Sequence, residues 1–264
     1  MYKLDKDKYG ILLDHLLTLP FNTLMARSVV CGHAEGTIYV DNTENPQTYY
    51  IVHAYGMTWL AGNSDNQAFN HWLRDYFQGK SFERKRDEWL QAYPRDWDEF
   101  MNGLVEENIA ALNTRINLKF SEAKFYETYN NIEKIDYEII ETPMEMLFEI
   151  NGTVVPKDYW ISLEKYSEIA KAFSVVVDGK PVCTAFTSAR HDNQLEIGIE
   201  TTEAFRGMGL AYFACAKLIE HCITNNLEPV WACRLENTAS LNLSKKLGFV
   251  EILRAPYYHV PMKK

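Results

Sequence analysis

Residues 201–222 read TTEAFRGMGLAYFACAKLIEHC, a stretch in which extended sequence gives way to helical spacing. Two glycines, Gly207 and Gly209, fall where the helix is expected to begin, so several backbone N–H groups there lack a partner and a side chain that would block approach. The helix dipole and Arg206 add positive charge at the same point. The junction therefore predicts a site for a phosphate or pyrophosphate. The alternative is that the glycines only permit a tight turn.

The sequence on either side of this junction predicts a fixed order of strands and helices. The apolar face of the expected helix comprises Leu210, Ala214, Leu218 and Cys222. Three strands rich in β-branched and aromatic residues are expected before it, over residues 171–179, 181–189 and 194–202. A strand over 229–235, a helix over 238–248 and a last strand over 249–260 are expected after it. The order is three strands, helix, strand, helix, strand.

The first half of the chain predicts the same order. An amphipathic helix is expected over residues 1–20 and is ended by Pro20. The elements expected after it are strands over 37–41, 48–55 and 57–61, a helix over 66–77, a strand over 87–93, a helix over 96–108 and a strand over 116–120. We therefore expect two α/β domains, residues 1–134 and 135–264. The residues of the two halves do not align convincingly, so the shared order leaves internal duplication open.

Composition and charge exclude several classes of protein. With 47% hydrophobic and 13% aromatic residues the chain is a folded globular protein. Its formal net charge of −9 would repel nucleic acid and suits a cationic small molecule. Five cysteines without a CxxC pair, and seven histidines without an HxxxH pair, predict neither disulfides nor a metal site. The same cysteines favour the reducing cytoplasm as compartment. Without a run of about 18 apolar residues we expect no membrane span, and Asp14 and His15 interrupt the short N-terminal apolar stretch, unlike the apolar core of a signal peptide.

A second motif lies downstream of the glycine junction. Asn237 follows the expected strand at 229–235, and Leu247, Gly248 and Phe249 end the expected helix. The two motifs together, with Arg206, Gly209 and Ala211 in the first, resemble the GNAT superfamily of acyl-CoA-dependent N-acetyltransferases. In that family an RxxGxG/A loop follows the fourth strand, and Asn and LGF mark the fifth strand and the helix after it. The resemblance covers residues 135–264, and EIGIETTEAFRGMGLA (196–211) is more narrowly similar to zwittermicin A resistance acetyltransferases.

The resemblance implies a fold and a cofactor site. It implies a mixed, mostly antiparallel α/β sheet flanked by helices over 135–264, preceded by a second α/β domain that is a candidate for a degenerate half of the same kind. It implies acetyl-CoA as cosubstrate, with no metal. The residues expected to hold acetyl-CoA are Ile199, Thr201, Arg206, Gly207, Met208, Gly209, Leu210, Ala211, Asn237 and Ser240. Backbone groups of residues 199–201 would bind the pantetheine arm as an added strand does.

The proton acceptor is expected among the glutamates of the strand before the loop. A protonated amine must lose a proton before it can attack, so a base is needed directly or through water. Strand alternation places Glu196 and Glu200 on one face, and Glu203 lies in the following turn. We favour Glu200, with Glu196 and then Glu203 as alternatives. A β-bulge would change which face each residue occupies, and each glutamate could instead pair with a basic residue.

The proton donor is harder to predict. Members of the family often carry Tyr in LYxKLGF, as general acid toward the leaving thiolate, but Ser244 stands at that position here. A serine hydroxyl is a weaker acid than a phenol. Ser244 could hold a water that protonates the sulfur, Tyr257 or Tyr258 could substitute, or no dedicated acid is required. Loss of catalysis with CoA binding retained is a further alternative.

The first half is expected to play a different part. The turn AGNSDNQ (61–67) takes the place of the glycine loop there, and its Asp65 would oppose a phosphate. We expect this half to bind no CoA and to complete the acceptor pocket or an interface. The sequence leaves the oligomeric state open, with a homodimer as one alternative.

The function that these observations favour is an N-acetyltransferase that moves an acetyl group from acetyl-CoA to an amine of a small molecule by direct attack. One competing hypothesis is a non-catalytic acyl-CoA-binding or sensing protein, because Ser244 replaces the usual Tyr. Another is a peptide or protein N-acetyltransferase, since the same fold would serve.

Overall fold

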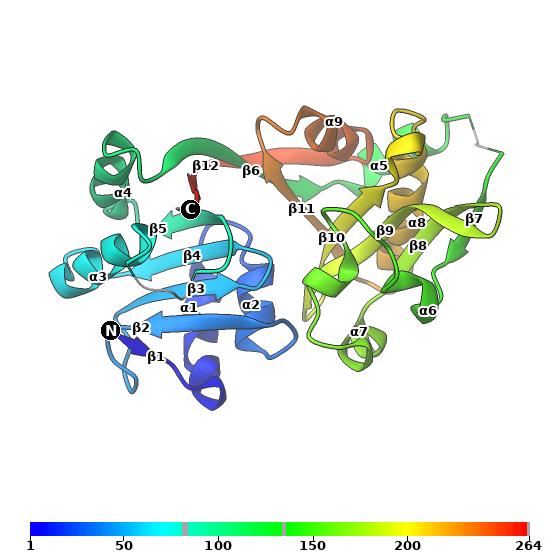
Figure 1. The fold of residues 1–264 in the computed structure, drawn as a ribbon. Helices are drawn as coiled ribbons and strands as arrows, with labels where there is room; N and C mark the ends of the chain where they lie inside the picture. The colour runs from blue at the N-terminus through cyan, green and yellow to red at the C-terminus, as the bar shows by residue number, and fades with distance from the viewer. Residues whose placement is uncertain (81–83, 134–135, 263–264) are drawn as a thin grey trace. The chain divides into compact units, whose positions relative to one another are not determined.

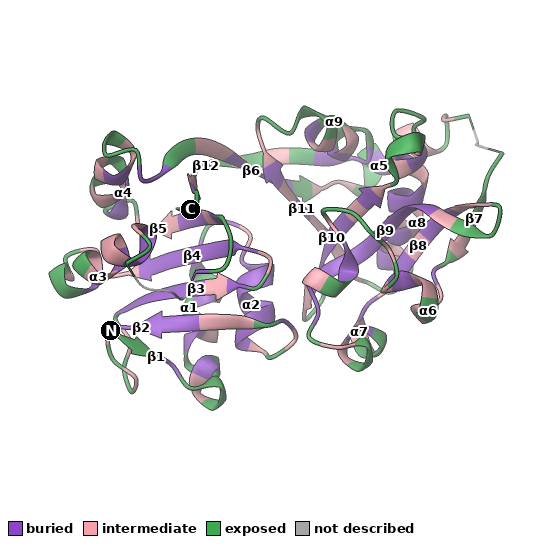
Figure 2. Cartoon of the chain, viewed as in Figure 1, coloured by how far each residue is buried: buried purple, intermediate pink, exposed green. Residues whose placement is uncertain are grey.

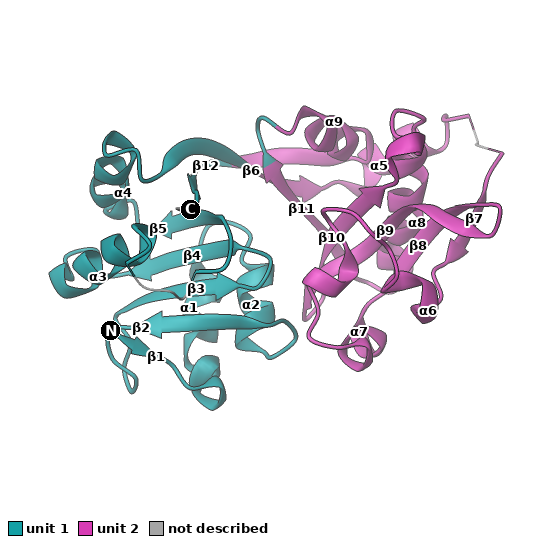
Figure 3. Ribbon diagram, viewed as in Figure 1, with its two compact units in different colours: residues 1–115, 234–236, 254–264 teal, residues 116–233, 237–253 magenta. Residues whose placement is uncertain are grey.

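The computed structural model describes residues 1–80, 84–133 and 136–262 (Figure 1). The chain forms two compact units, each built from separate stretches of sequence (Figure 3). Unit 1 comprises Met1–Arg115, Arg234–Glu236 and Arg254–Lys264, and unit 2 comprises Ile116–Cys233 and Asn237–Leu253. The domain boundary expected between residues 134 and 135 lies outside the described residues.

Unit 1 is a sheet with helices on it. Its elements are β1 (Tyr2–Lys3), η1 (Lys6–Leu12), α1 (Leu13–Thr18), α2 (Leu24–Val30), β2 (Gly36–Val40), β3 (Thr48–His53), β4 (Met57–Gly62), α3 (Gln67–Phe77), β5 (Glu88–Tyr93), α4 (Trp97–Glu106) and the start of β6 (Ala111–Phe120). The strand order is β1-β2-β3-β4-β5, followed by the end of β12 (Phe249–Val260). Pairing is antiparallel except between β4 and β5, which run parallel.

The core of unit 1 lies between this sheet and α3 and α4. The cross-strand row Tyr39, Tyr50 and Leu60 is buried against Phe69 and Leu73 of α3. Figure 2 shows burial concentrated on the central strands β3 and β4. Aromatic rings fill much of this layer, as their large apolar area favours.

The helix expected over residues 1–20 is wrong in part. The chain instead forms a 3-10 helix, η1, that leads into the short helix α1, and the extended residue Leu19 ends α1 before Pro20. Gly10 lies inside η1, where glycine disfavours a regular α-helix. The expected apolar face is confirmed in part, because Leu12, Leu16 and Leu19 are buried but Leu17 is exposed.

Unit 2 contains the sequence motifs. Its elements are the end of β6, α5 (Glu122–Tyr129), β7 (Glu138–Glu141), α6 (Met144–Leu147), η2 (Pro156–Asp158), α7 (Leu163–Ile169), β8 (Ala172–Val177), β9 (Lys180–His191), β10 (Gln194–Thr201), η3 (Glu203–Phe205), α8 (Leu210–Thr224), β11 (Glu228–Arg234), α9 (Thr238–Lys246) and the start of β12. The strand order is β12-β6-β11-β10-β9-β8-β7. The expected fold class, a mixed and mostly antiparallel sheet flanked by helices, is confirmed.

Two layers cover the central strands of unit 2. Helix α8 packs on β8, β9 and β10. On the opposite face, the segment between β7 and β8 covers the sheet, with the Tyr159 ring 5.6 Å from that of Phe186 in β9. The Trp160 indole N–H donates to the Thr187 carbonyl at 2.7 Å and fixes the same segment. The strands are therefore buried on both faces near their middle.

The two units share their order of elements and the sense of their strands. The series β2-β3-β4-α3-β5-α4-β6 matches β8-β9-β10-α8-β11-α9-β12. In each series the first three strands are antiparallel and the strand after the first helix pairs parallel with the third. The strand that ends each series pairs with the fourth strand of the other series, β12 with β5 and β6 with β11.

Candidate functional site

Strand β10 parts from β11 halfway along its length. The parallel register joins Gln194, Leu195 and Glu196 of β10 to β11 and stops there, whereas pairing with β9 continues to Thr201. Within the described residues, 197–201 therefore pair with a strand on one side only. An edge of this kind can bind an extended ligand. Of the residues expected to contact the pantetheine arm, Ile199 lies on this edge, whereas Thr201 already donates its N–H to Glu200 and accepts Arg206 Nε at its carbonyl.

The register shifts where the strands part. Glu196 pairs with Ala189 and the next residue, Ile197, pairs with Thr187, so Ser188 of β9 is the extra residue. The Ser188 hydroxyl donates to the Glu196 carbonyl at 3.1 Å. Because the extra residue lies on β9, side chains still alternate along β10. The expected bulge is present, but it does not move the glutamates to different faces.

The glycine junction forms an open helix N-terminus. Gly207 and Gly209 have φ of 81° and 78°, the left-handed region that favours glycine, and a Cβ on either would meet no atom within 4 Å. Gly209 is the N-cap of α8 and supplies no side-chain cap. Met208 between them is exposed, while Leu210 is buried as the first residue of the helix. The first N–H groups of α8 are thus left for another acceptor.

The corresponding turn of unit 1 is closed. The Asn66 side chain accepts a hydrogen bond from the Phe69 N–H at 3.1 Å and caps α3. Gly62, where β4 ends, has no free space, because a Cβ there would lie 2.0 Å from the Gln47 carbonyl oxygen. A side chain thus takes one N–H of the first turn of α3, whereas α8 has no such cap.

Arg206 lies beside the open loop and is more than half exposed. Its Nε donates to the Thr201 carbonyl at 3.0 Å, and its Nη2 lies 3.3 Å from the Glu200 carboxylate. These two contacts hold the guanidinium between the end of β10 and the start of the loop. Its remaining N–H groups keep their capacity to bind an anion.

Glu200 is held by two different parts of the chain. Its Oε2 accepts the N–H groups of Thr153 and Val154, each at 2.8 Å, and the Thr153 hydroxyl at 3.3 Å. Its Oε1 accepts the Thr201 N–H at 3.1 Å and faces Arg206. Only 8% of the residue is exposed. The carboxylate favoured as base therefore already has donors on both oxygens.

The other two glutamates have different surroundings. Glu196 is 3% exposed and lies at the last paired position before β10 leaves β11. Glu203 begins the 3-10 helix η3 and is exposed. The structure therefore places Glu196, and not Glu203, at the edge where the unpaired half of β10 begins.

The residues of the second motif stabilise α9. The Asn237 side chain accepts from the Ser240 N–H at 3.2 Å as N-cap, and the Ser240 hydroxyl accepts from the Trp231 indole at 3.1 Å. Ser244 is fully buried, and its hydroxyl donates to the Leu241 carbonyl at 2.9 Å. Nothing in this arrangement aims the Ser244 hydroxyl at a ligand, so its role as proton donor stays a prediction.

Other candidate groups have properties that disfavour acid or nucleophile roles. Tyr257 and Tyr258 belong to unit 1 and are buried, and burial raises the pKa of Tyr258 to about 12. Burial raises the pKa of the Cys183 thiol to about 11 and that of Cys222 to about 12, and it also raises that of Cys215. Such thiols stay protonated near neutral pH, whereas a nucleophile must be a thiolate.

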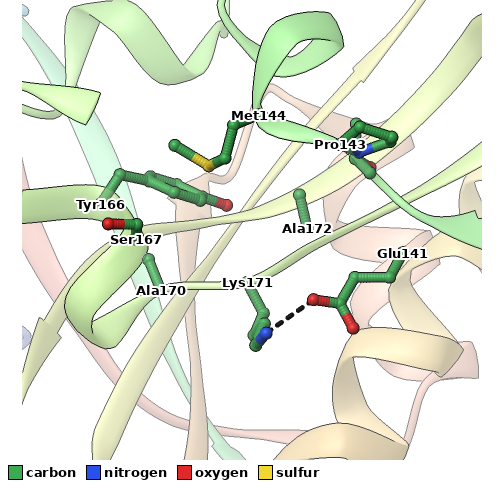
Figure 4. A pocket seen from close by; sticks show the side chains of 9 residues that line it. Glu141, Pro143, Met144, Tyr166, Ser167, Ala170, Lys171 and Ala172 are labelled. Atoms are coloured by element: carbon green, nitrogen blue, oxygen red, sulfur yellow. Dashed lines mark hydrogen bonds and ion pairs between the residues drawn. The ribbon is translucent and has the colours of Figure 1, made fainter. Parts of the chain in front are cut away.

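A hollow of about 290 Å³ opens beside β7 and β8. Figure 4 shows the Tyr166 ring reaching into it beside Met144, with the Lys171–Glu141 ion pair (2.6 Å) at the opposite side. Thr142 also lines it, and hydroxyl contacts of 2.8 and 2.7 Å run from Thr142 through Ser174 to Thr184, the register partner of Glu200. None of the site residues expected from the sequence lines this hollow.

Sequence reasoning missed the segment that binds Glu200. The donors Thr153 and Val154 carry no motif, and the only local signal is the Asn151-Gly152 dipeptide, which is typical of a turn. Gly152 lies so close that a Cβ would be 2.5 Å from the Glu200 carboxyl group.

In residues 1–80, 84–133 and 136–262, no group of three or more His, Cys, Asp or Glu side chains is placed to hold a metal ion. Over the same residues, none of the helices is both long and apolar enough to cross a membrane.

Comparison with known proteins gives one consistent result. A family model described as GNAT acetyltransferase matches residues 15–258. The match therefore covers most of the first half of the chain as well as the domain expected at 135–264. The chain is 24% identical over 229 residues, 85% of each chain, to an uncharacterized N-acetyltransferase, YdfB, of Bacillus subtilis.

Solved structures show the same fold. A GCN5-related N-acetyltransferase-like protein from Streptococcus suis aligns with a TM-score of 0.72 at 20% identity, over 96% of this chain and 99% of the other. A tandem GNAT protein from the clavulanic acid biosynthesis pathway aligns with a TM-score of 0.62 at 10% identity, over 98% and 96%. With the family model matched across both units, the chain belongs to the GNAT acetyltransferase family.

Proposed function

We propose that the protein is an N-acetyltransferase that moves an acetyl group from acetyl-CoA to an amine of a small molecule, with unit 2 as the catalytic unit. The observation that carries the proposal is the open N-terminus of α8 beside the unpaired half of β10. Of the two equivalent helices, only α8 leaves its first turn uncapped, and its two glycines leave space for a large anion.

The residues fit acetyl-CoA in kind. Gly207, Met208, Gly209 and the first turn of α8 offer N–H groups to a pyrophosphate, with Arg206 as counter-charge. The edge of β10 at residues 197–199, which pairs with no strand within the described residues, can offer hydrogen bonds to an extended amide chain. Thr201 ends this edge, with its N–H and carbonyl bound to Glu200 and Arg206. When bound, acetyl-CoA supplies the acetyl group as an activated thioester. Asn237 and Ser240 form the N-terminal cap of α9 and so contribute by stabilising the start of that helix.

Proton removal from the amine falls to a glutamate of β10. Glu200 has donors on both oxygens, so we assign the role of base to Glu196, directly or through a water. Burial raises the pKa of the Cys183 and Cys215 thiols, which disfavours the thiolate that an acyl-enzyme would need. Direct attack by the amine on the thioester requires no such intermediate. The similarity of residues 196–211 to zwittermicin A resistance acetyltransferases makes polyamines and amine-bearing antibiotics the first acceptors to test.

The first experiment is the shift in thermal unfolding caused by acetyl-CoA in the wild type and in Gly209→Asp. A ligand that binds only the folded state stabilises it by about 2.7 kcal/mol at a hundredfold excess over Kd. We expect a rise of several degrees in the wild type, and none in Gly209→Asp, whose carboxylate enters the anion site.

The control is Gly179→Asp. Gly179 has φ of 73°, and a Cβ there also meets open space, so the substitution imposes the same backbone strain away from the loop. Gly179→Asp should keep the full shift. Thiol release from acetyl-CoA with a panel of primary amines then tests transfer. A wild type that shows no shift at millimolar acetyl-CoA would refute the proposed function.

A further inference from the structure

The segment between α6 and η2, residues 148–155, binds the Glu200 side chain of β10 through Thr153 and Val154; we call it the strap. Gly152 and Thr153 in the strap are exposed, while the Glu200 side chain beneath them is buried. Farther along the chain, Trp160 pins the same layer to the Thr187 carbonyl. Glu200 thus joins the strap to β10 through a buried carboxylate.

The two oxygens of Glu200 serve two different neighbours. Oε2 takes three donors from the strap, two of them backbone N–H groups, and Oε1 takes the Thr201 N–H and faces Arg206 of the anion loop. Hydrogen bonds to a charged acceptor are stronger than neutral ones, and they are less screened when the acceptor is buried. Glycine at 152 lets the strap backbone approach this closely, because a Cβ would lie 2.5 Å from the carboxyl group.

We propose that Glu200 is a positioning residue, which holds the strap over β10 as the wall of the acceptor site and holds Arg206 in place for the cofactor. The residue does not remove the proton. A carboxylate covered by the strap would have to release Thr153 and Val154 before it could reach an amine, and that would open the wall that orients the amine. The predicted effects of Glu200 on KM and kcat rest on the proposed function, whereas its predicted effect on the strap does not.

The structural arm of the test is amide hydrogen exchange at Thr153 and Val154 in the full-length protein. Glu200→Ala removes both acceptors, and we expect exchange at these two amides to become about ten- to a hundredfold faster. Glu200→Gln keeps one oxygen for the strap, since its amide group cannot face the N–H donors, so it should restore most of the protection. Glu164→Gln, an exposed carboxylate on α7 of the same unit, is the matched control and should change nothing.

The kinetic arm uses the primary amine that the wild type acetylates fastest in the panel. Glu200→Ala should raise the KM for the amine about tenfold or more, with kcat at saturation within about threefold and an unchanged pH profile of kcat. Glu200→Gln should bring the KM back toward the wild-type value. Rescue by glutamine is the decisive readout, because glutamine can hold the strap and cannot accept a proton.

Three results would overturn the proposal. One is unchanged exchange at Thr153 and Val154 in Glu200→Ala. Another is a Glu200→Gln protein with normal strap protection whose kcat has collapsed, which would make Glu200 the base. The third is loss of the acidic limb of the pH profile in either variant. If the wild type neither binds nor turns over acetyl-CoA, the proposed function fails, and the exchange measurement still decides whether Glu200 holds the strap.

Discussion

Glu196 stands at the last paired position before β10 leaves β11, and it is nearly inaccessible to solvent. The Ser188 hydroxyl donates to the Glu196 backbone carbonyl at the register shift. This bond fixes the backbone of Glu196 at the point where β10 and β11 separate. A base at that place would meet an amine that approaches along the unpaired half of β10. Its neighbour Glu200 is also a glutamate and lies on the same face, so replacing each residue in turn tests which of the two is the base.

Replacing Glu196 by Gln should therefore lower kcat by about 10²- to 10⁴-fold, the usual contribution of general base catalysis. Affinity for acetyl-CoA should be unchanged, because no part of the anion loop is altered. Steady-state thiol release together with titration calorimetry measures both quantities. Equal kcat values for Glu196→Gln and the wild type would exclude Glu196 as base.

At the same scale, strand alternation predicted that Glu196 and Glu200 share a face, and the geometry of β10 agrees. The strap partners of Glu200 could not be predicted, because Val154 lies 46 residues away in sequence and contributes only its backbone N–H. A backbone donor leaves no trace in the identity of its own side chain. The sequence thus identifies which glutamates lie near the site, and the long-range contacts distinguish their roles.

The equivalent helices α3 and α8 differ at their N-termini. Asn66 caps α3, whereas α8 begins at Gly209 without a side-chain cap. Because α4 of unit 1 also lacks a side-chain cap, the distinguishing feature of α8 is the pair of glycines in its loop, which leaves the first turn open. Capping side chains satisfy one N–H of the first turn, so a capped helix has less to offer an anion. The uncapped start of α8 thus agrees with a binding role rather than a stabilising one.

Asn237 carries a prediction, because the resemblance implies that it binds the cofactor while the structure shows a cap. Asn237→Ala should lower the free energy of unfolding by about 1 kcal/mol, measured by urea denaturation without acetyl-CoA, since the cap of α9 is lost. Asn237→Asp should keep the stability, because Asp caps equally well. A loss of acetyl-CoA affinity in the stable Asn237→Asp protein would show the second role, whereas equal stability of all three proteins would contradict the cap.

Periodicity predicted the order of strands and helices in both halves, because each amphipathic element displays its own buried face. It failed where a short element depends on its neighbours. The 3-10 helix η1 contains Gly10, which disfavours a long regular helix, and the strap is made of turns and bends with no repeat of its own. The strap is held by Glu200, and the segment that follows it is held by the Trp160 bond to the Thr187 carbonyl; both partners are distant in sequence.

For the whole molecule, the main departure from the sequence-based view is that the units are not consecutive halves. Unit 1 includes the end of β12, whose Tyr258, His259 and Val260 pair antiparallel with β5. Arg84 donates to the Val260 carbonyl at 2.7 Å, and Asp87 accepts the His259 ring N–H and the Met262 N–H, each at 2.9 Å. Local patterns predict strands but not which sheet a terminal strand joins, so this exchange had no signal in the sequence.

The fragment of residues 1–134 should therefore fail to fold alone, although it matches the first expected domain. Tyr258 and Val260 are part of the core of unit 1, and burial of each such side chain is worth about 1.5–3 kcal/mol. Their loss, about 3–6 kcal/mol together, with the edge of β5 left unpaired, removes a large part of the 5–15 kcal/mol by which a domain is stable. Circular dichroism on heating should show no cooperative transition.

A synthetic peptide of residues 249–262 supplies the control, because it restores the missing strand without restoring unit 2. Added to the fragment, it should produce a cooperative transition whose midpoint rises with peptide concentration, as binding to the folded state alone requires. A peptide with Tyr258 and Val260 replaced by Asp should have no effect, since two charges cannot enter the apolar core. If the fragment melts cooperatively without any peptide, unit 1 does not depend on β12, and the strand exchange then stabilises the whole chain without being needed for its first half to fold.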